Sequence, residues 1–348
     1  MKNFTDIHVH MTDMNHEKCE QYLDLLADQD VTDATLLSLS YHSAAYNTHV
    51  LYWKNTYKKI RLSAFGMPHC VDIYKDIPFE IQAKALIDMG CDGIKLMFNP
   101  IMRKKLGHGV NDARYEKMFT YLEENDIPVL IHVNDPETYW IPRELTESEK
   151  QRGWGYFTGG YLTKQEIYDE TFEMLDRHPK LRVTFAHFFF LSNFIDEATR
   201  VMEKYPNVSF DLTPGWEMYL GFSKDIDAWQ AFFEKYSDRI IYGTDCNDEK
   251  TINPQIHQLV RMGISHDKTE FNLPAYRTNL QMKGLDLSEN TIDKIIHRNY
   301  KKFVGEPKPV DMVAVRGAAL RVLSDIEGLE DESYKKAASA LRCLLEKM

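Results

Sequence analysis

Short runs of β-branched and apolar residues alternate with longer amphipathic segments along most of this chain. Eight of the short runs predict β-strands, at Phe4–His10, Ala34–Leu39, Arg61–Met67, Gly93–Phe98, Pro128–Val133, Arg182–Phe188, Val208–Leu212 and Arg239–Asp245. The segments between them predict helices, among them Phe79–Met89, Tyr115–Asn125, Lys164–His178, Asn193–Tyr205 and Ile226–Tyr236. Because strands that alternate with helices form parallel sheets, this order predicts an α/β fold.

The number of strands distinguishes between two parallel architectures. Eight strands close a (β/α)8 TIM barrel, which needs about 250 residues, and 348 are present. The competing architecture is an open doubly wound sheet, whose nucleotide-binding members carry a glycine-rich phosphate loop after a strand. No predicted strand of this sequence is followed by such a loop. We therefore expect a (β/α)8 TIM barrel.

The alternating pattern ends after residue 306, and a helical C-terminal extension follows it. A predicted helix over Ser288–Val304 completes the barrel, and Pro307 and Pro309 then break the chain. This divides the chain into a barrel domain, residues 1–306, and an extension, residues 307–348. One face of the last helix is apolar, at Tyr334, Ala338, Leu341, Leu345 and Met348. Such a stripe either packs on the outside of the barrel or joins two subunits of a homodimer.

Composition argues against several classes of function. The chain has 42 Lys and Arg against 53 Asp and Glu, a formal net charge of −11, whereas binding nucleic acid without sequence preference needs a basic face. No apolar run approaches the roughly 20 residues that cross a membrane, and the first residues, MKNFTDIHVH, lack the apolar stretch of an export signal. The cysteines are odd in number and form no CxxC pair, at Cys19, Cys70, Cys91, Cys246 and Cys343. We expect a cytoplasmic protein that acts on a small molecule.

The first predicted strand ends in the motif Asp6-Ile7-His8-Val9-His10. Side chains two residues apart in a strand lie on the same face, so His8 and His10 point the same way and can hold one metal ion. A pair of this kind also arises by chance in a chain with 13 histidines. Its position favours the metal, because the active sites of TIM barrels lie at the C-terminal ends of the strands.

Three other predicted strands also carry a metal-binding side chain at or near their ends. His132 lies at the end of the fifth strand, His187 near the end of the sixth and Asp245 at the end of the eighth. A single histidine of this kind is more often a hydrogen-bonded core residue, and a single aspartate after a strand is usually a helix cap. Together on one face of a barrel, with His8 and His10, they predict a metal site. Nitrogen and oxygen ligands suit Zn2+, and imidazole also accepts manganese, iron or cobalt.

In this order the residues resemble the amidohydrolase superfamily, and in detail its amidohydrolase-2 branch, which includes the aminocarboxymuconate-semialdehyde decarboxylase-like enzymes. The resemblance spans residues 4–304 and leaves the C-terminal extension outside it. It is carried by the segments 93–96 (GIKL), 127–132 (IPVLIH), 185–187 (FAH), 205–211 (YPNVSFD), 241–245 (IYGTD) and 298–300 (RNY).

The resemblance implies a ligand set and a division of roles. His8, His10, His132 and Asp245 would surround one divalent ion, with Zn2+ favoured and Mn2+ as the alternative, and its bound water. Asp245 would accept the proton of this water and pass it to the leaving group. His187 would lie outside the ligand set and polarise the substrate carbonyl or handle a proton.

Lys95, on the fourth predicted strand, leaves two alternatives open. Some members of the superfamily use a strand-four lysine, carboxylated by carbon dioxide, as a bridge between two metal ions. His132 and His187 would then bind the second ion. In the other alternative, which we favour, Lys95 is an unmodified cation that neutralises a substrate carboxylate or pairs with a nearby acid.

The reaction that the resemblance implies is the hydrolysis of an amide, lactone or related bond by metal-activated water. A non-oxidative decarboxylase of the same family is the alternative. Decarboxylases of the family often carry a His-Pro-Trp-Asp type sequence at strand five, whereas this chain has His132-Val133-Asn134-Asp135. This difference favours hydrolysis. A barrel that binds metal without turnover is the third hypothesis.

Long loops after the predicted strands supply weaker candidates for substrate binding. Residues 135–161 include Trp140 and Arg143, and Trp216 follows the seventh strand. Loops of this length at the catalytic end form lids or specificity walls, although a surface excursion with its own apolar cluster has the same composition. Lys95, Arg143 and also Arg103 favour a substrate that carries a carboxylate.

Overall fold

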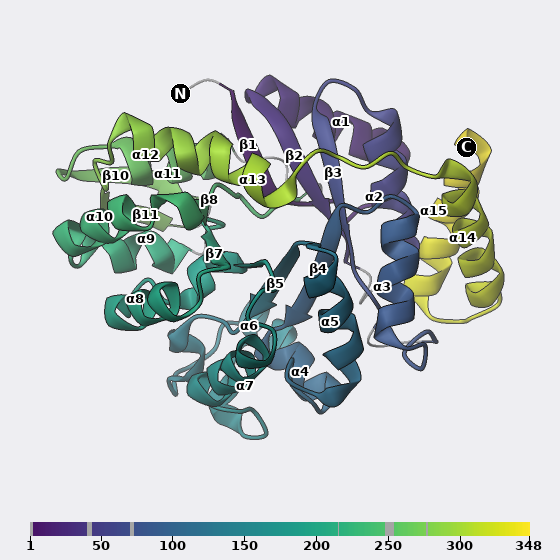
Figure 1. Ribbon diagram of the computed structural model, residues 1–348, viewed down its shortest axis with the longest axis horizontal. Helices are drawn as coiled ribbons and strands as arrows, with labels where there is room; N and C mark the ends of the chain where they lie inside the picture. The colour runs from purple at the N-terminus through teal and green to yellow at the C-terminus, as the bar shows by residue number, and fades with distance from the viewer. Residues whose placement is uncertain (1–2, 40–43, 70–72, 215, 248–253, 276–277) are drawn as a thin grey trace.

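Parallel strands form the centre of the computed structural model (Figure 1), which describes residues 3–39, 44–69, 73–214, 216–247, 254–275 and 278–348. Within these residues nine strands pair into one sheet in the order β8-β7-β6-β5-β4-β3-β2-β1-β9. The strands are β1 Phe4–His10, β2 Val31–Leu37, β3 Arg61–Gly66, β4 Gly93–Phe98, β5 Val129–Val133, β6 Val183–Phe185, β7 Val208–Asp211, β8 Ile240–Ile241 and β9 Cys246–Asn247. Every neighbouring pair is parallel, which confirms the predicted α/β barrel.

The predicted eighth strand, Arg239–Asp245, is two short strands rather than one. β8 pairs with β7, whereas β9 pairs with β1 at the opposite edge of the sheet. Between them the main chain turns at Asp245, whose φ of 55° lies in the left-handed region. The N–H of Asp245 donates to the carbonyl of His8 at 2.9 Å, and the N–H of Ile7 donates to the carbonyl of Tyr242 at 3.1 Å. One segment is therefore bonded to both edges of the sheet, and it closes the barrel.

The sixth strand is also shorter than its predicted range, Arg182–Phe188. β6 ends at Phe185, and residues 187–190 form a left-handed turn with φ between 53° and 56°. Left-handed residues other than glycine cost about 1–2 kcal/mol each, so packing must stabilise the turn. Phe188, for example, stacks on Phe233 with ring centroids 5.5 Å apart. The strand prediction was too long because a buried strand and a buried turn have the same apolar composition.

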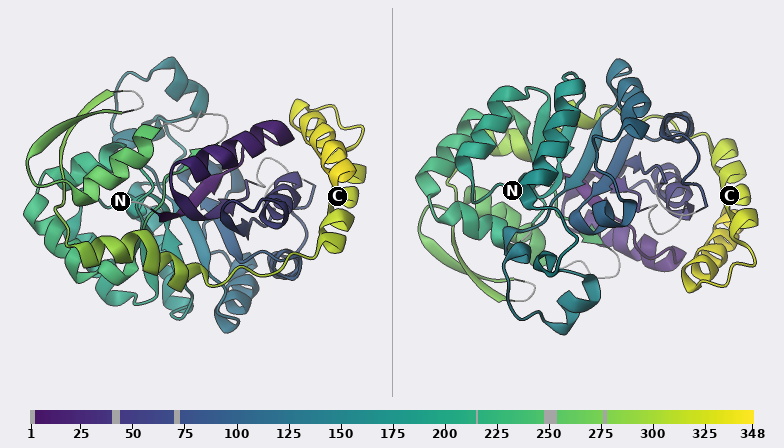
Figure 2. Two further views of the ribbon diagram at one scale, coloured as in Figure 1. Left: turned by 90° about the horizontal axis from the view of Figure 1, so that it is seen from above. Right: turned by 90° about the horizontal axis from the view of Figure 1, so that it is seen from below.

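Helices surround the sheet, and the five helices that periodicity predicts are α3, α5, α7, α8 and α10, as Figures 1 and 2 show. The helices are α1 His16–Asp28, α2 Ala45–Thr56, α3 Phe79–Asp88, α4 Pro100–Leu106, α5 Glu116–Glu124, α6 Glu147–Arg152, α7 Lys164–Arg177, α8 Ile195–Lys204, α9 Trp216–Ser223, α10 Ile226–Lys235, α11 Pro254–Ser265, α12 Glu289–Asp293, α13 Asn299–Val304, α14 Met312–Ile326 and α15 Glu332–Lys347. A π-helical turn, Lys294–Arg298, joins α12 to α13 within the helix predicted over Ser288–Val304. An unpredicted antiparallel hairpin, β10 Glu270–Ala275 and β11 Thr278–Lys283, lies between α11 and α12.

The helix α2 lacks the pattern by which an amphipathic helix is recognised. Residues 45–54 are all buried, so this part of the helix has no face in water. One side of it packs on β3 and another is covered by α14 from the C-terminal extension. Because amphipathic periodicity requires a face in water, a helix that is covered on both sides does not show it.

The C-terminal extension packs over α1 and α2 of the same chain, as Figure 2 shows. Of its apolar stripe, Ala338 and Leu341 are buried, and Tyr334, Leu345 and Met348 are partly buried against the same core. The stripe therefore packs on the outside of the barrel, the first of the two interpretations. The homodimer and the domain boundary at residue 306 stay predictions.

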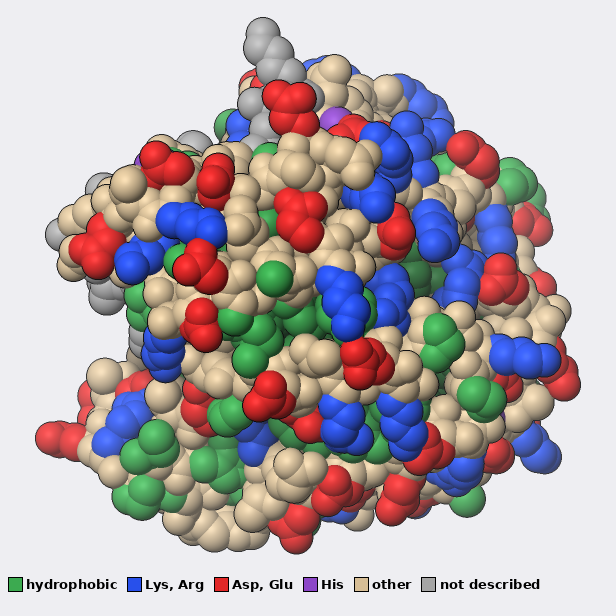
Figure 3. Space-filling view, turned by 60° about the vertical axis from the view of Figure 1, so that its left-hand side comes forward, with side chains coloured by type: hydrophobic (Ala, Val, Ile, Leu, Met, Phe, Trp, Pro, Cys, Tyr) green, Lys and Arg blue, Asp and Glu red, His purple; other side chains and the backbone are tan. Residues whose placement is uncertain are grey.

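The surface carries both charges. On the face drawn in Figure 3, Lys and Arg side chains are interspersed with Asp and Glu side chains. Among the described helices none is both long and apolar enough to span a bilayer. The expected absence of a nucleic-acid partner stays a prediction.

A buried carboxylate, Asp92, forms an ion pair with Lys54 of α2 and is also bonded to the start of the C-terminal extension. Lys54 Nζ lies 2.6 Å from Asp92 Oδ2, and the two side chains are 2% and 1% exposed. The Asp92 carboxylate also accepts hydrogen bonds from the N–H of Ala64 at 2.8 Å and from the N–H of Lys308 at 2.7 Å. A carboxylate with this many partners is well satisfied only while Lys54 neutralises it.

We predict that Lys54→Met destabilises the protein by about 3–5 kcal/mol, because removing one partner leaves a buried charge uncompensated. The free energy of unfolding from urea denaturation measures this loss. Lys59→Met is the matched control, since Lys59 forms an exposed ion pair with Asp24; its denaturation midpoint should equal that of the wild type. A Lys54→Met midpoint equal to that of the wild type and of Lys59→Met would contradict the stabilising role given to the buried ion pair.

Candidate metal centre

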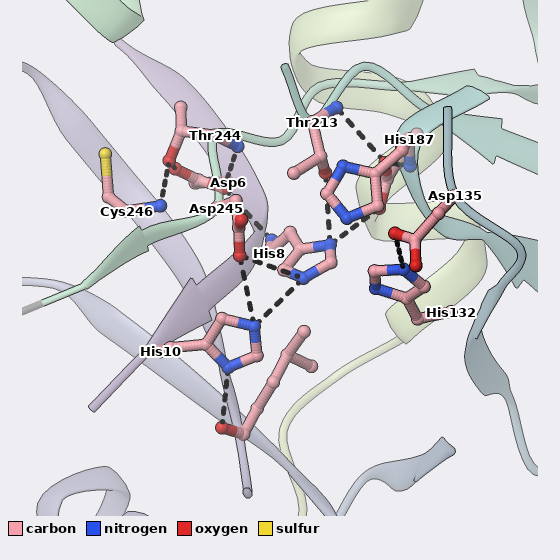
Figure 4. Close-up of polar contacts among 12 residues, drawn as sticks. Asp6, His8, His10, His132, Asp135, His187, Thr213, Thr244, Asp245 and Cys246 are labelled. Atoms are coloured by element: carbon pink, nitrogen blue, oxygen red, sulfur yellow. Dashed lines mark hydrogen bonds and ion pairs between the residues drawn. The ribbon is translucent and has the colours of Figure 1, made fainter. Parts of the chain in front are cut away.

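The carboxyl ends of the strands bring four predicted side chains to one end of the barrel (Figure 4). β1 carries His8 and His10, the turn after β6 carries His187, and the bend between β8 and β9 carries Asp245. His8 and His10 lie two residues apart on β1 and point to the same side, as the spacing predicts. Barrel closure then places Asp245 next to them.

Three donor atoms from these residues converge. His8 Nε2 and His10 Nε2 are 3.1 Å apart, and Asp245 Oδ1 lies 3.5 Å from the first and 3.2 Å from the second. Among the described residues, these three form a group that could hold a metal ion, with all donor atoms within 4.8 Å of one another. An ion with bonds of about 2.1 Å at tetrahedral angles holds its ligand atoms about 3.4 Å apart. The observed separations are of this size.

The far sides of both imidazoles are held by hydrogen-bond acceptors. His8 Nδ1 lies 2.9 Å from Asp211 Oδ2, and His10 Nδ1 lies 3.3 Å from the carbonyl of Leu37. The Thr213 hydroxyl also lies 3.0 Å from His8 Nδ1, and a hydroxyl can accept as well as donate. Because the carboxylate and the carbonyl can only accept, the hydrogen-bond network assigns the ring proton to Nδ1 in both histidines. Their Nε2 lone pairs then face each other and Asp245. Three acceptors this close repel one another unless a cation lies between them, so the donor set fits a divalent metal ion.

Burial also favours a neutral ring for His8. The ring is buried, and this, with the nearby positive charge of Lys95, holds the pKa of His8 well below its usual range. A neutral imidazole is the form that binds a metal.

His132 lies apart from the three converging donors. Its Nε2 is 3.1 Å from the carbonyl of Asn134 and 3.6 Å from Asp135 Oδ1. The His187 ring contacts both His132 and the metal group, with its centroid 4.6 Å from that of His132 and 5.6 Å from that of His8. A role for His132 as a ligand, to one ion or to a second, stays a prediction.

One ring nitrogen of His187 is buried without a hydrogen-bond partner among the described residues. This atom is Nδ1, and the ring as a whole is buried. Burial, with the neighbouring His132, lowers the pKa of His187 to about 4. The imidazole is therefore neutral near pH 7 and can act as a hydrogen-bonding group rather than as a cation.

Asp211, at the end of β7, has no role in the sequence analysis beyond a place in a family segment. Its fully buried carboxylate accepts from the main-chain N–H of His187 at 2.8 Å and of Thr213 at 3.1 Å, besides its contact with His8. Burial raises its pKa. The available signal was its position, because Asp211 lies near the end of a predicted strand, as Asp245 does.

A second buried carboxylate, that of Asp6, is bonded to the main chain next to the metal-binding side chains. Asp6 Oδ1 accepts from the N–H groups of His8 and Thr244 at 3.0 and 3.2 Å, and its Oδ2 accepts from the Thr244 hydroxyl at 2.6 Å. Burial raises the pKa of Asp6 to about 7. These bonds join β1 to the segment that leads into Asp245.

Lys95 is fully buried on β4, and its Nζ has no hydrogen-bond partner among the described residues. Burial lowers its pKa to about 8, although the charges of Asp211 and Asp245 oppose this shift. Carboxylation of Lys95 stays a prediction. As it stands, Lys95 is a buried amine near two carboxylates with its hydrogen-bonding capacity unused.

The loop candidates make contacts within their own region. Trp140 donates from Nε1 to the carbonyl of Leu162 at 2.9 Å. Arg143 forms two bonds with Glu149, at 3.0 and 2.6 Å, and Arg103 is paired with Glu170 in the same way. Trp216 begins α9, but its side chain lies outside the described part of the structure.

Comparisons with known proteins point to one family. A model of the amidohydrolase family matches residues 5–305. The fold is similar to that of a protein from Staphylococcus aureus assigned as an amidohydrolase, with a TM-score of 0.55 and 15% identity over 88% of this chain and 100% of the other. An uncharacterized TIM-barrel protein from Bordetella bronchiseptica gives a TM-score of 0.54 and 13% identity over 87% and 99%. No curated protein matches the sequence.

We predict that Lys95→Met stabilises the metal-free protein by about 2–4 kcal/mol near pH 7, because a pKa lowered from 10.5 to about 8 reflects the cost of burying the charge. Below pH 8 the lysine is protonated in both the folded and the unfolded chain, so the cost is fully present. Above pH 10.5 it is neutral in both, and the cost disappears. Chemical denaturation at pH 7 and at pH 10.5 should show a gain that shrinks at high pH. A destabilised variant at pH 7 would contradict an unpartnered, charged Lys95.

Proposed function

This chain belongs to the amidohydrolase family, and we propose that it is a metal-dependent hydrolase that cleaves an amide, lactone or related bond in a small polar molecule. One observation carries the proposal: the Nε2 atoms of His8 and His10 and the Oδ1 atom of Asp245 converge as three acceptors 3.1–3.5 Å apart. Unpartnered polar atoms of Lys95 and His187 lie close to this group.

The proposed cofactor is one divalent ion held by His8, His10 and Asp245, with Zn2+ favoured by the nitrogen and oxygen ligands and Mn2+ as the alternative. When bound, such an ion polarises a substrate oxygen and activates water near neutral pH. The three side chains would hold it, and Asp211 and the Leu37 carbonyl already orient the two imidazoles.

Asp245 is the ligand that a substrate can reach. Its side chain is 40% exposed, whereas those of His8 and His10 are 1% and 8% exposed. Its Oδ1 faces the histidines, which leaves the second carboxylate oxygen to accept a proton from the attacking water and return it to the leaving group. The two histidines, buried and hydrogen-bonded through Nδ1, are left to act as ligands.

His187 and Lys95 are the proposed partners of the substrate. The His187 ring, buried and neutral, can hydrogen-bond the oxygen on which negative charge develops. Lys95, buried nearby, can bind a carboxylate or the same oxygen. Because Arg143 and Arg103 are already paired with glutamates, the proposal of a carboxylate-bearing substrate rests on Lys95.

A non-oxidative decarboxylase of the same family is the second candidate. The observation in its favour is again Lys95, a buried cation without an anion bonded to it, which could hold the departing carboxylate. In that reaction a proton replaces carbon dioxide on the substrate carbon, and no water is consumed.

Elemental mass spectrometry of the purified protein tests the metal centre. We expect about one Zn or Mn per wild-type chain, and none in His10→Ala, which removes one of three ligands. His266→Ala is the matched control, because His266 directly follows α11 and its Nδ1 is bonded to the carbonyl of the next residue, Asp267; it should keep the ion. About two ions per chain would favour a second site with a carboxylated Lys95. No ion, after purification without chelator and with added metal, would contradict the proposal.

Product analysis separates the two reactions. On a panel of amides, lactones and aromatic carboxylates, hydrolysis gives an acid that contains an oxygen from 18O-labelled water, whereas decarboxylation releases carbon dioxide. For the substrate found, His187→Gln should lower kcat by about 10²–10³-fold at unchanged metal content, the usual effect of removing an oxyanion donor. A kcat equal to that of His266→Gln would rule out the role given to His187.

A further inference from the structure

The Asp211 carboxylate is bonded to the metal-binding strand and to the substrate-side turn at once. Its Oδ2 lies 2.9 Å from His8 Nδ1, and its Oδ1 accepts from the main-chain N–H of His187 at 2.8 Å. The N–H of Thr213 bonds to the same Oδ1 at 3.1 Å. The carboxylate is fully buried, so water does not compete for these bonds.

The first bond decides which nitrogen of His8 carries the proton. A carboxylate can only accept, so it holds the proton on Nδ1 and leaves the Nε2 lone pair directed at His10 and Asp245. Without this acceptor either tautomer is available, and one of them places a proton where the ion must bind. The bond to Asp211 therefore prepares His8 as a ligand.

The second bond holds the start of the left-handed turn. His187 has a φ of 56°, and the three residues after it are left-handed as well. Such a run is unfavourable for residues with side chains, and its first N–H is fixed by Asp211. The turn is held further along by Tyr168, whose hydroxyl donates to the carbonyl of Phe189 at 2.8 Å. The direction of the His187 ring depends on this support.

We propose that Asp211 is a positioning residue that couples the metal centre to His187. Its two oxygens orient a ligand through one bond and the substrate-side imidazole through the other, so that binding of the ion and placement of His187 stabilise each other. The inference rests on the proposed metal-dependent function. Coupling of this kind is reciprocal: if an ordered turn favours the ion, the ion must order the turn.

Asp211→Asn separates the two bonds without changing the volume of the side chain. Its amide oxygen can still accept from the N–H groups of His187 and Thr213. Its NH2 group, however, faces His8 Nδ1 and favours the tautomer in which Nδ1 accepts and the proton lies on Nε2, the ligand position. The Thr213 hydroxyl, 3.0 Å from the same Nδ1, can donate as well as accept and therefore does not oppose this shift. The variant therefore keeps the hydrogen bonds that hold the turn at His187 and loses the bond that keeps the Nε2 atom of His8 free to bind the ion. The matched control is Asp92→Asn, which changes an equally buried carboxylate that contacts Lys54 instead of a histidine.

Two measurements on the full-length protein test the proposal. The first is the Zn2+ dissociation constant from competition with a chromophoric chelator. We expect Asp211→Asn to bind Zn2+ about 10–100-fold more weakly than the wild type, as for other residues that orient a metal ligand. Asp92→Asn should bind with the wild-type affinity, even where thermal denaturation shows it to be less stable.

The second measurement is amide hydrogen exchange of peptides that cover residues 183–191. Saturating Zn2+ should slow exchange in this segment at least about fivefold in the wild type and in Asp92→Asn. In Asp211→Asn at saturating Zn2+ the effect should be absent, while exchange without metal matches the wild type.

The outcomes are distinguishable. A wild type that binds no Zn2+, Mn2+ or Co2+ would overturn the proposed function. A wild type that binds Zn2+ while Asp211→Asn binds it with equal affinity would overturn the role of Asp211 alone. Weaker binding in Asp211→Asn, with the effect of Zn2+ on exchange preserved, would leave Asp211 as a support of His8 and overturn the coupling.

Discussion

The hydrogen bond from the N–H of Asp245 to the carbonyl of His8 joins the last segment of the barrel to the first strand. It closes the sheet, and in the same step it brings Asp245 Oδ1 within 3.2 Å of His10 Nε2. β9 meets β1 in a single register, with Cys246 opposite Val9. Since a shift of one residue would turn each side chain to the other face, the position of the carboxylate follows from the closure of the barrel. The candidate metal centre is in this sense a property of the whole ring of strands.

The site combines polar atoms that have hydrogen-bond partners with buried polar atoms that have none among the described residues. Behind the ligands, Asp211 and the Leu37 carbonyl bond to the imidazoles and leave their Nε2 atoms directed inward. Close by, Lys95 Nζ and His187 Nδ1 are buried without a partner among the described residues. Buried polar groups are nearly always paired, so unpaired ones beside a prepared ligand set favour a binding site over a structural core. Burial strengthens whatever bonds they form with a substrate, because the local dielectric is low.

Left-handed backbone conformations, which are unfavourable for residues with side chains, occur at the strand ends that carry the site. Asn134 after β5, His187 after β6 and Asp245 between β8 and β9 all have positive φ. Such conformations persist only when the surrounding structure determines them. Around the turn after β6 this is done by aromatic packing, such as Phe188 on Phe233, and by the hydrogen bond to Asp211. The apolar layer outside the barrel therefore contributes to the geometry of the polar site inside it.

The order of strands and helices, and the positions of histidines and aspartates at strand ends, could be predicted from the sequence because periodicity and strand ends are local properties. Locality also explains what could not be predicted. The division of the eighth strand, the burial of α2 beneath the C-terminal helices and the pairing of Arg143 with Glu149 depend on contacts between distant segments. The sequence determined which metal-binding side chains were available. The tertiary structure decided that His8 and Asp245 converge and that His132 lies apart from them. It also decided that Asp211 is bonded to both His8 and His187. The physical reason is that hydrogen bonds between strands far apart in the chain set the register, and the register sets the distances.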